Sequence, residues 1–276
     1  MKKIVLTGAA GALGHQLRAP LAAMADQLVS TDLADTVEGL AGNETYVKAD
    51  LGDAAAVMDL LEGAEMVVHF GAIGDEAPFE EILHSNFLGA YNVWNAAQKH
   101  GVRRIVYASS IHAMGMYPKT TRIDTKMPHR PDTFYGLSKC FAEDMASMYW
   151  DKYGIEAVCL RIYSASGPVG NARALGSWLS YDDLIQLVQR SIDTPITGFT
   201  VVYGVSNNDR SPVDNSAASF LGYRPKDNAE DFAEAILSQT PQADPQDKAQ
   251  MCHGGPFATV PLGESGVAYI KKMSVS

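Results

Sequence analysis

The stretch Lys3-Ile-Val-Leu-Thr-Gly-Ala-Ala-Gly-Ala-Leu-Gly14 decides the fold of this chain. Its first five residues form a short apolar run typical of a buried strand, and an apolar helical pattern follows from Gly14 to Ala25. The glycines between them permit a tight turn and let the backbone approach a pyrophosphate, which then meets the helix N-terminus. Gly-x-x-Gly-x-x-Gly is weak alone, but between a strand and a helix it predicts a dinucleotide site. The expected contacts from this turn are Gly8, Gly11, Ala12, Leu13 and Gly14.

Short apolar runs and helical stretches alternate over the first two-thirds of the chain. This rhythm is typical of a parallel sheet covered by helices on both faces. We therefore expect an α/β fold with a Rossmann-type doubly wound parallel sheet. The expected strands are Lys3–Thr7, Leu28–Asp32, Thr45–Lys48, Met66–Phe70, Arg104–Ala108 and Ala157–Arg161. The expected helices are Gly14–Ala25, Ala54–Leu61, Glu80–His100 and Pro131–Tyr153.

The pattern changes near residue 163, where a loop rich in glycine and serine begins. We expect one domain over residues 1–276, with a dinucleotide-binding core over about 1–163 and a small substrate lobe and tail over about 164–276. Within the lobe, Ser180 is the expected N-cap of an apolar helix. Further elements expected there are a strand at Phe199–Val205, a short helix at Asn228–Leu237 and an irregular tail from Pro241.

Bulk properties exclude several classes of protein. The formal net charge is −10 and no stripe of lysine and arginine occurs, which argues against a nucleic-acid partner. No apolar run approaches the ~20 residues that cross a bilayer, and the apolar run after Met1 is too short for a signal peptide. The three widely spaced cysteines fit a reducing compartment. We expect a cytoplasmic protein without a metal site, in which the two longest helices pair across a two-fold axis to form a homo-oligomer.

Asp32 indicates which dinucleotide binds. A carboxylate at the end of the second strand can accept both ribose hydroxyls of adenosine and would repel a 2′-phosphate, and no arginine occurs in residues 33–36. The sequence thus favours NAD over NADP, although the same Asp could instead cap a turn. Asp50 allows the same two interpretations, as an adenine contact or an N-cap. The remaining expected NAD contacts are Asp32, Leu33, Asp50, Leu51, Phe70, Gly71, Ala72, Asn86 and Ile162.

Tyr135 and Lys139 lie four residues apart, on one face of a predicted helix. A phenol ionises near pH ~10, and a nearby ammonium favours the phenolate. The pair therefore predicts a general base for oxidation of an alcohol. Ser110 ends the fifth strand, where its hydroxyl can bind the substrate alcohol or merely satisfy backbone groups. Asn86 is expected to hold a water near Lys139.

Taken together these motifs resemble the extended short-chain dehydrogenase/reductases, and within them the uronate dehydrogenases. The resemblance covers nearly the whole chain. It rests on Ala108-Ser-Ser-x-His112-x-x-Gly115-x-Tyr117-Pro118, Tyr135-Gly-x-Ser-Lys-Cys140-Phe141, Ser177-Trp-x-Ser-x-Asp-Asp183, Phe220-Leu-Gly-Tyr-Arg-Pro-Lys-Asp-Asn228 and Gly254-Gly-x-Phe257.

The resemblance implies NAD-dependent oxidation of a hexuronic acid such as glucuronate or galacturonate, at the anomeric carbon, to an aldarolactone. It implies that Tyr135 is the base, that Lys139 lowers its pKa and holds the nicotinamide ribose, and that Ser110 binds the reacting hydroxyl. It further implies that His112 and Ser164 contact the sugar and that Arg173 binds its carboxylate. A surface ion pair for Arg173 and a structural role for His112 are the alternatives.

The chain departs from the family pattern at three substrate positions. Gly74 and Ile111 stand where the family usually has Ser and Asn, and Tyr163 replaces a small residue before Ser164. Lost polar contacts of this kind alter discrimination between sugar epimers. The alternatives are therefore a dehydrogenase of a neutral or phosphorylated hexose, a sugar epimerase of the same superfamily, and a protein that only senses NAD. The expected substrate contacts are Gly74, Ser110, Ile111, His112, Tyr135, Ser164 and Arg173.

Overall fold

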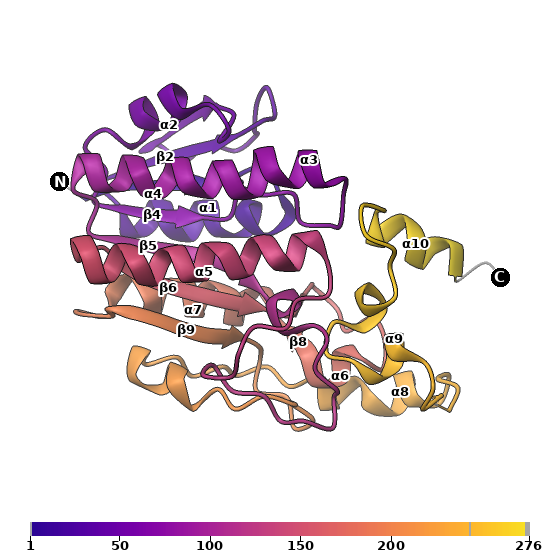
Figure 1. The fold of residues 1–276 in the computed structure, drawn as a ribbon. Helices are drawn as coiled ribbons and strands as arrows, with labels where there is room; N and C mark the ends of the chain where they lie inside the picture. The colour runs from indigo at the N-terminus through magenta and orange to yellow at the C-terminus, as the bar shows by residue number, and fades with distance from the viewer. Residues whose placement is uncertain (1, 243, 274–276) are drawn as a thin grey trace.

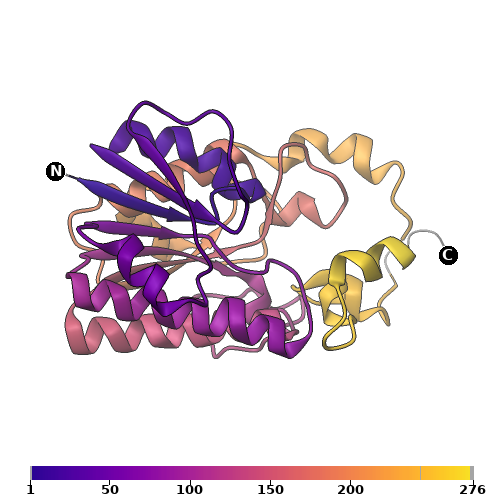
Figure 2. The ribbon, with the colours of Figure 1, turned by 90° about the horizontal axis from the view of Figure 1, so that it is seen from above.

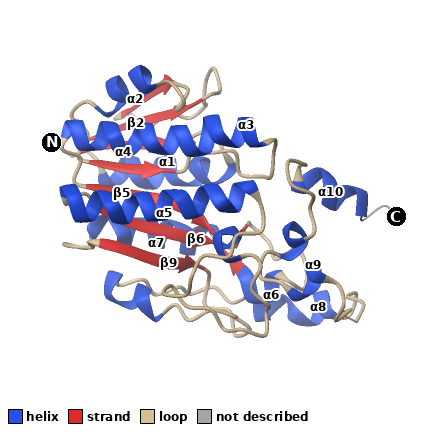
Figure 3. Ribbon diagram, viewed as in Figure 1, coloured by secondary structure: helices blue, strands red, loops and turns tan. Residues whose placement is uncertain are grey.

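A computed structural model describes residues 2–242 and 244–273. Seven strands form one parallel sheet in the order β3-β2-β1-β4-β5-β6-β9 (Figures 1 and 3), which confirms the expected fold class. Their bounds are β1 Lys3–Thr7, β2 Gln27–Asp32, β3 Glu44–Lys48, β4 Met66–His69, β5 Arg104–Ser110, β6 Glu156–Ile162 and β9 Phe199–Gly204. A separate two-stranded sheet joins β7 (Ser164–Ala165) to β8 (Trp178–Leu179).

Helices cover both faces of the large sheet (Figure 2). One layer contains α1 (Ala12–Met24) and α7 (Tyr181–Asp193), and the other contains α2 (Ala54–Leu61), α4 (Gly89–His100) and α5 (Phe134–Tyr153). Successive strand residues point to opposite faces, so in β1 Ile4 and Leu6 enter one apolar core while Val5 enters the other. Burial on both faces explains why the strands read as continuous apolar runs.

Several expected boundaries differ from the structure. The expected helix Glu80–His100 is a continuous rod of α3 (Phe79–Ile82), a π-helical segment η1 (Leu83–Leu88) and α4. The expected helix from Pro131 begins at Phe134, because Thr133 Oγ1 accepts a hydrogen bond from Gly136 N at 2.9 Å and caps it. The N-cap expected at Ser180 is confirmed, with Oγ accepting from Asp183 N at 3.1 Å.

The short helices of the lobe labelled α6, α8, α9 and α10 lie at the carboxyl ends of the strands (Figure 1). The segment expected as an irregular tail contains regular turns of helix, which the proline- and glycine-rich sequence does not suggest. The helical elements outside the two layers are η2 Ile111–Met114, α6 Ala174–Ser177, η3 Ser216–Leu221, η4 Ala229–Phe232, α8 Ala233–Leu237, α9 Lys248–Met251, η5 Gly255–Ala258 and α10 Gly266–Met273. None of the helices in the described part of the chain has the length and hydropathy needed to span a bilayer.

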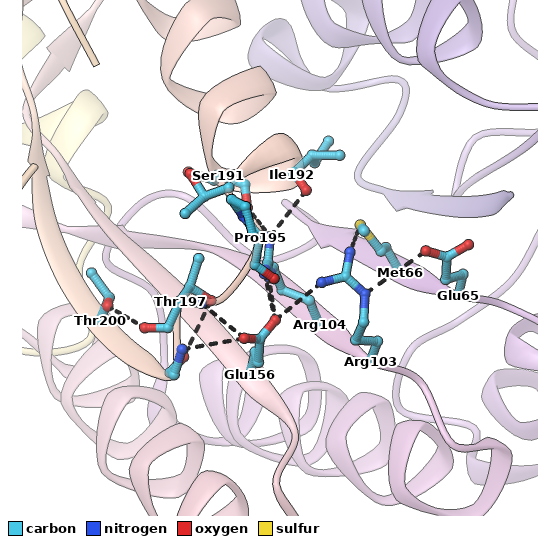
Figure 4. Close-up of polar contacts among 12 residues, drawn as sticks. Glu65, Met66, Arg103, Arg104, Glu156, Ser191, Ile192, Pro195, Thr197 and Thr200 are labelled. Atoms are coloured by element: carbon cyan, nitrogen blue, oxygen red, sulfur yellow. Dashed lines mark hydrogen bonds and ion pairs between the residues drawn. The ribbon is translucent and has the colours of Figure 1, made fainter. Parts of the chain in front are cut away.

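A buried ion pair fastens the opposite, amino-terminal edge of the sheet (Figure 4). Arg104 Nε donates to Glu156 Oε2 at 2.8 Å, and Arg104 Nη1 donates to the carbonyls of Ser191 and Ile192 at the end of α7. Glu156 Oε1 accepts from Thr197 N at 2.8 Å. Breaking such a buried pair typically costs about 3–5 kcal/mol. This edge is therefore structural, and the carboxyl edge is left for ligands.

Candidate active site

The residues expected to bind the adenosine half of the cofactor line one cavity of about 310 Å³ at the carboxyl edge of the sheet. The glycine turn between β1 and α1 forms one wall of this cavity, and the ends of β2, β3 and β4 form the others. The expected contacts found there are Gly8, Gly11, Asp32, Leu33, Asp50, Leu51, Phe70, Gly71 and Ala72.

Glycine is required in this turn. Gly8 has φ +75°, and a Cβ there would lie 2.6 Å from the backbone of Phe70 and of Gly71. A Cβ on Gly14 would overlap the carbonyl of Gly8. Because these positions carry no side chain, the backbone N–H groups beside the N-terminus of α1 remain accessible to a pyrophosphate.

Asp32 and Asp50 each take part in turn geometry as well as lining this cavity. Asp32 Oδ2 accepts from Ala10 N at 2.9 Å and its Oδ1 accepts from Leu33 N at 2.7 Å. Asp50 accepts from Gly52 N at 2.8 Å and contacts His84 Nε2 at 3.0 Å. Because an ionised carboxylate offers about four acceptor positions, these bonds leave room for ribose or adenine donors.

The expected catalytic residues line a second cavity of about 450 Å³. It shares Gly8, Gly11, Phe70 and Ala72 with the first, so the two form one continuous trough. Lys139 Nζ lies 5.3 Å from the ring centroid of Tyr135 and donates to Ala108 O at 2.8 Å. The other expected site residues on its wall are Ala12, Leu13, Gly14, Gly74, Ser110, His112 and Ile162.

Burial shifts both members of the Tyr-Lys pair toward their neutral forms. Burial raises the pKa of Tyr135 to about 12, although a hydrogen bond from Ser110 opposes this. Burial lowers the pKa of Lys139 to about 7, although Glu143 opposes this. At Tyr135 desolvation therefore outweighs the hydrogen bond from Ser110. The expected lowering of the phenol pKa by Lys139 stays a prediction.

The shift at Lys139 predicts a pH dependence of stability. The unfolded chain holds this lysine near its ordinary pKa of ~10.4, whereas the folded pKa is about 7. Between these values the unfolded state binds more protons, so the free energy of unfolding should rise with pH across this window. Each pKa unit is worth ~1.4 kcal/mol, so wild type should gain a few kcal/mol relative to Lys139→Met between pH 7 and 10. Urea unfolding without cofactor measures this.

The exposed Lys152 provides the control, since Lys152→Met removes a lysine of the same helix that water already solvates. Its difference from wild type should stay flat with pH. A Lys139→Met curve that is parallel to wild type from pH 7 to 10 would contradict the shift.

A buried network beneath the Tyr-Lys pair was not expected from the sequence. Glu143 accepts from Ser109 Oγ at 2.5 Å and from Arg161 Nη2 at 2.7 Å, and contacts His129 Nε2 at 2.8 Å. Its own burial raises its pKa, but the bonds from His129 and Arg161 outweigh this and lower it. The only sequence signal was the spacing of four from Lys139 to Glu143, which places both on one helical face.

Asn86 lies in the π-helical segment, and its amide is committed to other protein groups. Its Nδ2 donates to Ile73 O at 3.0 Å and to Ser138 Oγ at 3.1 Å, and its Oδ1 accepts from Ile73 N at 2.8 Å. It thus ties the loop after β4 to α5. The expected contact with a water near Lys139 stays a prediction.

Arg173 lies in a neighbouring cavity of about 240 Å³, and Tyr163 lines both this cavity and the catalytic one. Arg173 donates from Nη1 to Ser164 Oγ and from Nη2 to His253 O, both at 2.9 Å, while its buried Nε has no partner. Within residues 2–242 and 244–273 it forms no ion pair with a carboxylate. The alternative role of Arg173, in a surface ion pair, therefore has no carboxylate to support it among the described residues.

Two expected substrate residues occupy different positions from the rest. Ile111 is 1% exposed and packs with Met114 and Tyr203 in an apolar cluster that also supports Tyr163, so it does not line the catalytic cavity. Ser164 is bonded to Arg173 and, at 3.1 Å, to Ser177. Tyr163 OH is 2.8 Å from His253 Nδ1 of the C-terminal segment, a residue that the sequence gave no reason to select.

The described residues hold no group of three or more His, Cys, Asp or Glu side chains arranged to bind a metal.

A comparison with known protein families identifies the family of this chain. The sequence pattern described as "NAD dependent epimerase/dehydratase family" matches residues 4–181. The chain belongs to this family.

Relatives within the family agree with the resemblance to uronate dehydrogenases. A uronate dehydrogenase of Pseudomonas putida is 47% identical over 93% of this chain and 95% of its own length. The crystal structure of uronate dehydrogenase from Agrobacterium tumefaciens, a tyrosine-to-alanine mutant complexed with NAD, has a TM-score of 0.90 and 44% identity, covering 95% of this chain and 98% of that one. An NAD-dependent glucose-6-phosphate dehydrogenase of Haloferax volcanii is 32% identical over 83% of this chain and 95% of its own length. The resemblance predicted from sequence is confirmed.

Proposed function

We propose that this family member is an NAD-dependent uronate dehydrogenase that oxidises a hexuronic acid at its anomeric carbon to an aldarolactone. The observation that carries the proposal is Arg173, a half-buried arginine whose buried Nε has no hydrogen-bond partner and whose guanidinium forms no ion pair with a carboxylate among the described residues. It lines a cavity that shares Tyr163 with the cavity of Tyr135 and Lys139. A desolvated charge without a partner is costly, and a substrate carboxylate would provide that partner. The named activity of the relatives points the same way.

Each catalytic side chain has a separate role. Ser110 holds the anomeric hydroxyl, and the phenolate form of Tyr135 accepts its proton as the C1–H bond breaks with its electron pair leaving as hydride and the C1=O bond of the lactone forms. NAD⁺, when bound, supplies the acceptor for the hydride and a positively charged ring. Lys139 holds the ribose, and its hydrogen bond to Ala108 O at 2.8 Å fixes Nζ beside the Tyr135 ring. When protonated, Lys139 favours the phenolate. The glycine turn of Gly8 and the Asp32 carboxylate select the dinucleotide.

The carboxylate end of the substrate is bound by local donors in an acidic protein. A guanidinium forms a bidentate, charge-assisted pair with a carboxylate, and Ser164 Oγ steadies Arg173 in that orientation. Lys119 lies in the same cavity, and its pKa is lowered by burial and by Arg173. Both cations therefore gain from a bound anion.

A second candidate substrate is a phosphorylated hexose. The specific observation in its favour is the pairing of Lys119 with Arg173 in one cavity, since two cations suit a dianion. One relative is named for glucose 6-phosphate. The uronate remains the better fit because the relatives with higher identity are named for it.

The exposed surface supports a homo-oligomer. The helices α4 and α5 lie side by side on one face (Figure 2), and large apolar side chains on the helical rod from Leu83 to His100 and on α5 remain exposed to solvent. Burying these in a second copy would remove apolar area from water. The exposed set is Leu83, Leu88, Tyr91, Leu137, Phe141, Met148 and Tyr153. We place the protein in the cytoplasm as a single domain.

A substrate panel tests the function. Purified protein is mixed with NAD or NADP and, in turn, glucuronate, galacturonate, glucose and glucose 6-phosphate, and reduced cofactor is followed by absorbance. Reduction of NAD by the uronates alone is the expected result. Turnover of glucose 6-phosphate in preference to uronates would favour the second candidate. Cofactor binding without reduction by any sugar would contradict an enzyme and favour an NAD sensor.

A further inference from the structure

His112 is fixed from three sides at the wall of the catalytic cavity. Its Nδ1 lies 2.8 Å from Asp132 Oδ2, and its ring lies 4.2 Å from that of Phe257 at 31° between planes. Its backbone N donates to Ser110 Oγ at 3.2 Å. The ring centroid of Tyr135 is 5.7 Å away. A side chain held this closely has little rotational freedom to lose when a sugar binds.

The carboxylate of Asp132 has a space built for it. Its side chain is fully buried, and Oδ1 accepts from Thr133 Oγ1 at 2.9 Å. A Cβ on Gly115 or on Gly254 would overlap Oδ2, and a Cβ on Gly136 would lie 3.1 Å from Oδ1. Gly254 belongs to the C-terminal segment, whose N–H donates to Gly115 O at 2.8 Å. Three separate segments therefore close around one carboxylate.

The geometry points to Asp132 as a positioning residue for the dehydrogenase reaction, which fixes His112 in the Nδ1–H form and presents its Nε2 as a hydrogen-bond acceptor to a substrate hydroxyl. An ionised carboxylate only accepts, so the proton between the two side chains belongs to Nδ1. The hydrogen bond of one ring nitrogen decides the state of the other. In the described part of the chain Nε2 has no protein partner. This inference rests on the proposed function, because it assigns a role within that substrate site.

The chemistry explains why a carboxylate is needed behind this ring. Without a partner on Nδ1, the imidazole can turn over or adopt the Nε2–H form, and the cavity then faces a donor in place of an acceptor. A sugar hydroxyl that donates to Nε2 would lose its acceptor. Asp132 therefore acts on substrate binding through His112 without touching the substrate.

Two variants of Asp132 distinguish a role in orienting His112 from a role in the stability of the fold alone. Asp132→Asn keeps the size of the side chain and an oxygen that can accept from Nδ1–H, while Asp132→Ala removes the acceptor. We expect Asp132→Ala to raise the KM for uronate by ~5- to 20-fold through loss of a well-oriented hydrogen bond. Asp132→Asn should stay within about threefold of wild type, and the KM for NAD should not change. Asp183→Asn, a buried carboxylate bonded to Lys226 N and Asp227 N in the lobe, is the control for lost stability.

A spectroscopic measurement decides the tautomer without any turnover. The chain has seven histidines, and ¹⁵N NMR of their rings, with His112→Gln to assign the signal, distinguishes Nδ1–H from Nε2–H. We expect Nδ1–H in wild type and in Asp132→Asn, and loss of that signature in Asp132→Ala. An Nε2–H signature in wild type, or an unchanged KM for uronate in Asp132→Ala, would overturn the inference. Wild type that oxidises no uronate would overturn the proposed function, while the NMR result would still decide the tautomer.

Discussion

Replacing Tyr135 with phenylalanine should lower kcat for uronate oxidation by about 10²- to 10⁴-fold, the usual contribution of a positioned general base. The change removes one oxygen from the cavity that also contains Ser110 and Lys139. The rest of the residue stays anchored, because Tyr135 N donates to Glu76 Oε2 at 2.9 Å through the backbone. The dissociation constant for NAD, measured by fluorescence titration, should therefore remain nearly unchanged.

Tyr223→Phe is the matched control for this substitution. Tyr223 is buried and donates from its hydroxyl to Val205 O at 2.8 Å, outside the cofactor trough. Its loss should lower stability by ~0.5–1.5 kcal/mol, as for a typical hydrogen bond, and leave kcat unaffected. A Tyr135→Phe enzyme that retains wild-type kcat would exclude Tyr135 as the base.

The sequence was sufficient wherever the determining contacts are local. The turn at Gly8 follows from three glycines placed between a strand and a helix, and the structure supplies the positive φ that requires one of them. The Tyr135 and Lys139 pair follows from helical spacing of four residues. The parallel sheet follows from alternating strands and helices.

Contacts between distant segments could not be read from the chain. His253 reaches Tyr163 across 90 positions, and Asp132 reaches His112 across 20. The first contact depends on where the C-terminal segment folds back, and the composition of that segment suggested only an irregular tail. The raised pKa of Tyr135 could not be read from the sequence either, because desolvation is a property of the assembled cavity.

Two of the three departures from the family pattern are linked in the structure. Ile111 is buried in the apolar cluster against which Tyr163 packs. An apolar residue at 111 and an aromatic ring at 163 therefore support each other, and neither would be explained alone. Gly74 is separate, since a Cβ there would enter open space at the cavity wall. A serine at 74 would fit without strain, so its absence leaves one polar contact fewer for the sugar.

Replacing Arg173 with alanine should raise the KM for a uronate by about 10- to 150-fold, which corresponds to about 1.5–3 kcal/mol for hydrogen bonds to a charged group. The guanidinium has Ser164 Oγ and His253 O as partners but no carboxylate among the described residues, so its charge is available to the substrate. Arg173→Lys keeps the charge but loses the planar fork, and it should fall between wild type and alanine. Initial rates at varied uronate and saturating NAD give the values.

Arg210 is a matched control for Arg173, because it is a second arginine that lines the same cavity. Its Nε, however, already donates to Glu230 Oε2 at 2.6 Å, and this ion pair is exposed. Exposed pairs contribute only ~0–1 kcal/mol, so Arg210→Ala should leave the KM for uronate within a few-fold of wild type. Equal increases in KM for Arg173→Ala and Arg210→Ala would indicate that the substrate responds to the overall positive charge of the cavity and not to a specific bond with Arg173. An Arg173→Ala enzyme with the wild-type KM would place the substrate carboxylate elsewhere, because a salt bridge to this guanidinium cannot be lost without a cost in binding.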